Sequence, residues 1–140
     1  MNGVTVDASV WVAAAELSDP FCSQSRAFLA RVAGRQAQIS VPAFARVEIA
    51  CALARRRQDV TLARQLTDSM LAPGQVVQVP VDPGLIERAV LLGTRAFLRG
   101  ADALYPATAQ LVGDALISWD DELIQRAGAL TPSAWLAANA

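Results

Sequence analysis

The sequence predicts an α/β protein in which a central parallel sheet of four or five strands is flanked by helices. Short apolar segments of strand type alternate with longer segments whose apolar residues recur at helical spacing. Strands separated by helices imply a parallel sheet covered on both faces. The length of 140 residues and the 54% share of hydrophobic residues suit one core, so we expect residues 1–140 to form a single domain.

The first half of the chain supplies two of the expected strands. Residues 3–6 form an apolar segment that ends at Asp7, and residues 38–41 form a second one that is stopped by Pro42. Helices are expected at residues 9–17, 19–33 and 43–57. In the last of these, apolar residues recur at three and four positions and predict one buried face, made of Phe44, Val47, Cys51 and Ala54.

The second half continues the alternation. A helix is expected at residues 60–71, a strand at 76–81, a helix from 82 that Arg99-Gly100 closes, and a further helix that begins at Asp102. The last strand, residues 115–118, precedes Asp120, and a helix follows at 122–127. In the helix that begins at residue 82, seven residues are expected to face inward: Leu85, Ile86, Ala89, Val90, Gly93, Ala96 and Phe97.

Two absences from the composition restrict the possible chemistry. The chain has no histidine, and all 12 of its basic residues are arginine. Without histidine there is no Ser-His or Cys-His dyad, and without lysine there is no P-loop lysine and no Schiff base. The remaining candidates for catalysis are mainly carboxylates, which favour hard ions such as Mg²⁺ or Mn²⁺.

Other features of the sequence predict a cytoplasmic protein. The two cysteines form no C-x-x-C pair and are expected to be small core residues in a reducing compartment. No apolar run approaches the roughly 18 residues of a membrane span, and the N-terminus does not resemble a secretion signal. The net charge is −1, but residues 26–99 hold 11 arginines against five acids. This segregation fits either arginines around an acidic metal site or solvated helix faces, and charge alone favours the second.

Four carboxylates are candidates for a site. Asp7 and Asp120 each follow a predicted strand, and the carboxyl ends of parallel strands share the sheet edge where ligands bind. Asp102 opens a predicted helix, while Glu48 lies at the edge of a predicted buried face, where a charge needs a partner. Helix capping explains each aspartate singly, and a salt bridge with Arg46 or another arginine explains Glu48 as well as a metal does. A divalent cation would relieve the repulsion among all four.

The segments around these acids resemble those of PIN-domain ribonucleases, and most closely VapC-type toxins of toxin–antitoxin pairs. The matching segments are VTVDAS at residues 4–9, VPAFARVEIACAL at 41–53, LRGADALY at 98–105 and LISWDDEL at 116–123. Their order and spacing extend from residue 4 to about residue 127. Two positions depart from the family: Tyr105 stands where relatives often have histidine, and Pro106 removes an early helix hydrogen bond near Asp102.

The resemblance implies a Rossmann-like three-layer fold, an acidic pocket for Mg²⁺ or Mn²⁺, and endoribonuclease activity on single-stranded RNA. It implies a homodimer that a cognate antitoxin inhibits, often through an arginine that enters the pocket. The same resemblance assigns the pocket to Asp7, Glu48, Asp102 and Asp120, with Ser9 and Ser118 hydrogen-bonding within it and Asp121 as a weaker candidate.

Arginine and tryptophan side chains are secondary candidates for contacts. The run Arg55-Arg56-Arg57 suits a helix C-terminus and, as a second hypothesis, RNA phosphates or an acidic antitoxin surface. Trp119 is the best candidate for stacking on a base, whereas Trp11 and Trp135 are expected to pack against helices or a dimer partner.

Two rival functions remain. A phosphoacceptor receiver domain also has aspartates at strand ends, but it needs a lysine that this chain lacks. The other rival is a catalytically silent PIN scaffold that binds RNA or protein, and the presence of all four acids argues against it.

Overall fold

A computed structural model of the chain describes residues 3–140 and contains a four-stranded, fully parallel sheet. The strands are β1 (Val4–Val6), β2 (Ile39–Pro42), β3 (Val76–Val79) and β4 (Ala115–Ile117), in the spatial order β3-β2-β1-β4. The strands of the central pair, β1 and β2, are buried along their whole length, as expected for strands with helices on both faces. The predicted α/β class and parallel sheet are thus confirmed.

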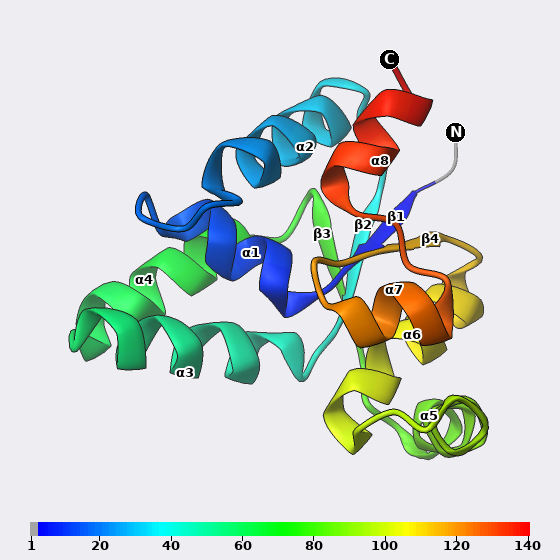
Figure 1. Ribbon diagram of the computed structural model, residues 1–140. Coiled ribbons are helices and arrows are strands. Elements are labelled where there is room, and N and C mark those ends of the chain that lie inside the picture. Colours follow the sequence, from blue (N-terminus) through cyan, green and yellow to red (C-terminus); the bar gives the residue numbers. More distant parts are fainter. Residues whose placement is uncertain (1–2) are drawn as a thin grey trace.

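Helices enclose the sheet in three layers (Figure 1). On one side lie α1 (Ala8–Ala15), α2 (Cys22–Gly34), α3 (Ala45–Arg57) and α4 (Val60–Met70). On the other side α6 (Gly100–Val112) packs on the sheet, and α5 (Pro83–Ala96) packs on α6. Two short helices follow β4, namely α7 (Asp121–Ala127) and α8 (Pro132–Ala138). None of the helices within residues 3–140 has the length and apolar character to span a membrane.

The buried face predicted for α3 is wrong. Val47 is 51% exposed and Cys51 is also exposed, whereas Ala45, Ile49 and Leu53 are buried. The helix carries two apolar stripes, and only the stripe with four-residue spacing packs on the core. Because Cys51 lies on the other stripe, it is not the core residue that its sequence context predicted, although Cys22 is buried.

The inward face of α5 is narrower than predicted. Leu85, Ala89 and Gly93 are buried at a spacing of four residues, but Val90 and Phe97 are 53% and 81% exposed, and Ile86 is exposed too. The physical reason is that α5 is an outer helix, which packs on α6 through one stripe. A Cβ at Gly93 would lie 2.7 Å from the Cβ of Ala103 in α6, so the crossing requires glycine there.

Several element boundaries differ from the predictions. The helix expected to open at Asp19 begins at Cys22, after the Asp19 carboxylate has accepted a hydrogen bond from the Phe21 N–H. Pro42 is the last residue of β2, and β3 stops at Val79. The α5 helix ends at Ala96 because Phe97 adopts a left-handed conformation, and α6 then begins at Gly100. Helix α8 had no sequence prediction.

Candidate active site

Asp7 lies at the carboxyl end of β1 and is 6% exposed. The hydroxyls of Ser9 and Ser118 each donate a hydrogen bond of 2.7 Å to its Oδ2, and the Ser9 N–H lies 3.4 Å from the same atom. Asp7 therefore does cap α1, as one sequence interpretation held. Because all these bonds use Oδ2, Oδ1 accepts none from residues 3–140 and is free for another ligand.

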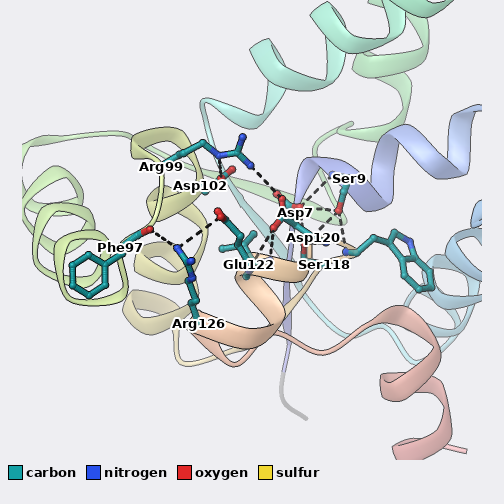
Figure 2. Close-up of polar contacts among 11 residues, drawn as sticks. Asp7, Ser9, Phe97, Arg99, Asp102, Ser118, Asp120, Glu122 and Arg126 are labelled. Atoms are coloured by element: carbon teal, nitrogen blue, oxygen red, sulfur yellow. Dashed lines mark hydrogen bonds and ion pairs between the residues drawn. The ribbon is translucent and has the colours of Figure 1, made fainter.

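The two serines connect Asp7 to the loop after β4. Ser118 accepts a 2.9 Å hydrogen bond from the N–H of Asp120, and Ser9 accepts one of 3.0 Å from the N–H of Trp119. Each hydroxyl therefore donates to Asp7 and accepts from the β4–α7 loop. This network holds the ends of β1 and β4 together, in agreement with the expectation that Ser9 and Ser118 bond within the site (Figure 2).

Glu48 stands on α3 at the edge of the same site and is half-buried. Its Oε1 accepts a 2.6 Å hydrogen bond from the hydroxyl of Tyr105, which is fully buried on α6. Of the alternatives left open for Glu48, a salt bridge with Arg46 is wrong, because Arg46 pairs with Asp68 at 2.8 Å. Tyr105, a departure from the family pattern, thus acts as the partner of a site acid.

Asp102 and Asp120 share one cation. The Nε of Arg99 lies 3.1 Å from Oδ2 of Asp102, and its Nη2 lies 3.8 Å from Oδ2 of Asp120 (Figure 2). Asp120 caps α7 through hydrogen bonds from the N–H groups of Glu122 and Leu123. Asp102 is not a cap, because Arg99 occupies the capping position of α6 and Asp102 lies in the first turn.

Pro106 lies inside α6 without ending it. A proline has no N–H, so the carbonyl of Asp102, four residues earlier, loses its usual partner within the helix. Asp102 keeps its place in the first turn, which answers the question that Pro106 raised about its position.

The site acids disfavour one another's charge. Burial is the first cause that raises the pKa of Asp7, Glu48 and Asp102. For Glu48 the charges of Asp7 and Asp102 raise the pKa further, although the Tyr105 hydrogen bond lowers it. Burial and the neighbouring acids also raise the pKa of Tyr105, so its hydroxyl stays protonated and remains a donor. Within residues 3–140 Arg99 is the only cation in an ion pair with any of the four acids.

The model of the PIN domain family matches residues 4–130. The chain belongs to the PIN domain family. The matched segment includes all four acids and both serines of the candidate site. No curated protein gives a significant match.

Solved structures share this fold closely. VapC20 of Mycobacterium tuberculosis, a sarcin-ricin loop cleaving toxin, aligns with a TM-score of 0.75 at 19% identity over 91% of this chain and 97% of its own. A toxin–antitoxin complex from Klebsiella pneumoniae aligns with a TM-score of 0.69 at 18% identity, over 93% of this chain and 98% of the matched chain. PAE2754 from Pyrobaculum aerophilum aligns with a TM-score of 0.71 at 20% identity, over 98% of this chain and 94% of its own. At such identities these likenesses show the fold, which confirms the expected PIN-like, Rossmann-like architecture.

The donor chemistry of this PIN domain fits a hard divalent cation, since carboxylates and hydroxyls surround a region of excess negative charge. As they stand, however, no three acidic side chains among residues 3–140 are grouped so that they would hold an ion together. Each acid instead has its own partner: the serines for Asp7, Tyr105 for Glu48, and Arg99 for Asp102 and Asp120.

Other predicted contact residues are placed differently. Asp121 is exposed on the first turn of α7 and has no ion pair among the described residues. Trp119 stacks on Phe21 with ring centroids 4.1 Å apart, and its indole N–H donates a hydrogen bond to Ser25. One face of the indole ring is therefore covered by Phe21 and is not open to a base. Trp11 and Trp135 are buried, as expected.

The arginine run supports the loop between α1 and α2. Arg56 pairs with Asp19 at 3.2 Å, and Arg57 pairs with Glu16 at 3.0 Å and donates to a backbone carbonyl of α1. Arg55 is exposed on the last turn of α3, where a cation complements the helix dipole. The helix dipole, which the sequence favoured as the role of the run, thus fits Arg55, whereas Arg56 and Arg57 form ion pairs that the sequence did not predict.

Two residues of the site were missed in the sequence. Arg99 was interpreted only as the end of a helix, and Glu122, whose charge contributes to the raised pKa of Asp102, was taken as an ordinary helix residue. The spacing in the sequence could have predicted the contact of Arg99 with Asp102, because residues three apart face each other on a helix.

Proposed function

We propose that this PIN domain is a divalent-metal-dependent endoribonuclease of the VapC toxin type, which cleaves RNA phosphodiester bonds and is inhibited by a cognate antitoxin. The observation that carries the proposal is the gathering of four carboxylates, from the end of β1, α3, α6 and the β4–α7 loop, where the charges of neighbouring acids contribute to the raised pKa of Asp7, Glu48 and Asp102. The names of the structural neighbours, which include a sarcin-ricin loop cleaving toxin and a toxin–antitoxin complex, support it.

In this proposal Asp7, Glu48, Asp102 and Asp120 hold Mg²⁺ or Mn²⁺. The bound ion supplies positive charge and Lewis acidity for hydrolysis of the phosphodiester. Ser9 and Ser118 fix the Asp7 carboxylate through Oδ2 and leave its Oδ1 toward the site. Tyr105 holds Glu48 in a single orientation through its short hydrogen bond.

The same acids suit the proposed inhibition by an antitoxin. The guanidinium of a partner's arginine can form two parallel hydrogen bonds with a carboxylate. Within this chain Asp102 already accepts a hydrogen bond from the guanidinium of Arg99, and Asp120 forms an ion pair with it. We further propose that the protein is cytoplasmic, which suits its two free cysteines, Cys22 and Cys51. Coexpression with the product of an adjacent small open reading frame, followed by copurification, tests the antitoxin.

The proposed homodimer has a candidate surface on α5. Exposed apolar side chains, including Ile86, Val90 and Phe97, line an apolar groove of about 770 Å³ between α5 and α6. Patches of this kind mark interaction sites on soluble proteins. The double variant Val90→Ser, Phe97→Ser is expected to shift the protein from dimer to monomer in light scattering; an unchanged mass would exclude this surface.

A catalytically silent scaffold that binds RNA or protein is the second candidate. The observation that favours it is that no three acids within residues 3–140 are arranged to hold an ion together. Antitoxin-free protein separates the two functions. A nuclease produces discrete new RNA ends with Mn²⁺ but not with EDTA, whereas a scaffold produces none.

Variants complete this test. Asp7→Asn should abolish cleavage while the protein still folds and binds its antitoxin. Asp68→Asn is the matched control, because Asp68 is half-exposed on α4 and its one ion pair within residues 3–140 is with Arg46. If Asp7→Asn cleaves RNA as the wild type does, Asp7 has no role in catalysis, and if neither cleaves any RNA, the scaffold function is correct.

A further inference from the structure

Arg99 reaches across the mouth of the acidic site. It lies between α5 and α6, and its side chain is 74% exposed. Its guanidinium contacts two site acids from different elements, at 3.1 Å for Asp102 on α6 and 3.8 Å for Asp120 before α7 (Figure 2). Arg99 therefore bridges Asp102 and Asp120, whose carboxylates accept no hydrogen bond from a serine or tyrosine among the described residues.

Helix formation does not account for the position of Arg99. It occupies the capping position of α6 but makes no side-chain capping bond. A cation at a helix N-terminus is unfavourable, because the helix dipole places positive charge there. What favours its position is the charge of the acids, which also raises the pKa of the Arg99 guanidinium, chiefly through Asp102.

We propose that Arg99 is a resident counter-ion of the acidic site, which a divalent cation displaces. Without metal it neutralises Asp102 and Asp120; when metal binds, the long exposed side chain moves out and releases their oxygens. The inference rests on the proposed metal site. It explains why the acids are gathered without being arranged around an ion: two of them are turned toward the arginine.

The weakness of the ion pairs makes such an exchange feasible. Exposed pairs stabilise a protein little, because water screens them and the long side chain loses entropy in forming them. A divalent cation carries twice the charge. Arg99 should therefore lower the metal affinity without preventing binding.

Titration of Mn²⁺ into RNA-free protein, followed by calorimetry or by the rise of the melting temperature, tests the exchange. Arg99→Gln is expected to bind Mn²⁺ about two- to fivefold more tightly than the wild type, the range that an exposed ion pair allows. Arg126→Gln is the matched control. It loses the same charge nearby, but Arg126 pairs with Glu122 at 3.7 Å, and within residues 3–140 it forms no ion pair with Asp7, Glu48, Asp102 or Asp120.

The possible outcomes separate the two proposals. Tighter binding by Arg99→Gln, with Arg126→Gln close to the wild type and Arg99→Lys between, supports the counter-ion. Equal Mn²⁺ affinity of Arg99→Gln, Arg126→Gln and the wild type overturns the counter-ion and leaves the metal site standing. Absence of Mn²⁺ binding by every variant overturns the metal site and the counter-ion with it.

Discussion

Replacement of Asp7 by asparagine tests whether the buried charge of this helix cap lowers the stability of the fold in the absence of metal. An asparagine can keep its oxygen toward Ser9 and Ser118, so both hydroxyl bonds persist in neutral form. The change from charged to neutral acceptors costs about 1 kcal/mol for each bond. Against this, a carboxylate that is 6% exposed is removed, and its burial costs several kcal/mol. We therefore expect Asp7→Asn to be more stable than the wild type by about 1–2 kcal/mol in EDTA at neutral pH.

The difference in stability must also depend on pH. Because burial raises the pKa of Asp7 in the folded protein, the folded state binds a proton more readily than the unfolded chain. The destabilisation by this group is therefore complete above the folded pKa and is lost as pH falls toward the ordinary value of 3.8. The advantage of Asp7→Asn should accordingly be largest at neutral pH and shrink on acidification.

Urea unfolding measures this difference directly, at neutral pH and at stepwise lower pH, in EDTA and then with Mn²⁺. Mn²⁺ should raise the free energy of unfolding of the wild type more than that of Asp7→Asn. A variant that is 2 kcal/mol or more less stable than the wild type in EDTA at neutral pH would refute the reasoning. The charge of the carboxylate would then stabilise the fold through its hydrogen bonds by more than its burial costs.

Three further substitutions examine the surroundings of the site. Tyr105→Phe removes the donor to Glu48, so urea unfolding should show a loss of about 1–3 kcal/mol, and the pKa of Glu48 should rise further in an NMR titration. Gly93→Ala sets a methyl group against Ala103 and should cost about 1–3 kcal/mol in the same unfolding assay. Arg57→Gln frees the α1–α2 loop, so limited proteolysis there should accelerate; cleavage of RNA that falls without faster proteolysis would instead assign Arg57 to RNA binding.

The sheet and the position of the site follow from the sequence because they depend on local pattern. Apolar segments that end in Asp7 and Asp120 predict parallel strands whose carboxyl ends meet, and the structure joins them through Ser9 and Ser118. Helix faces were predicted less well. Both α3 and α5 carry more apolar residues than one buried stripe needs, and only the packing of neighbouring helices decides which stripe is covered.

Sequence patterns could not identify the residues that partner the acids. Glu48 and Tyr105 are 57 residues apart and meet only because α3 and α6 approach the same edge of the sheet. Arg99 and Asp120 likewise come from different elements. Such pairs depend on the three-dimensional arrangement of helices, so a charge at the edge of a helix face predicts that a partner exists but not which residue it is.

The four acids differ in what holds their carboxylate oxygens. Asp7 and Glu48 are held by short bonds from the buried residues Ser118 and Tyr105, so their orientations are set by the core. Oδ1 of Asp120 is also held, because it accepts hydrogen bonds from the N–H groups of Glu122 and Leu123. Oδ2 of Asp120 and Oδ2 of Asp102 face an exposed arginine whose contacts are longer. An entering cation would therefore meet two carboxylates already in place, and the rearrangement would fall on the Arg99 side, where ion pairs are weak. Substitutions of Asp7 or Glu48 should alter stability and metal binding together, whereas Arg99→Gln should alter metal binding alone.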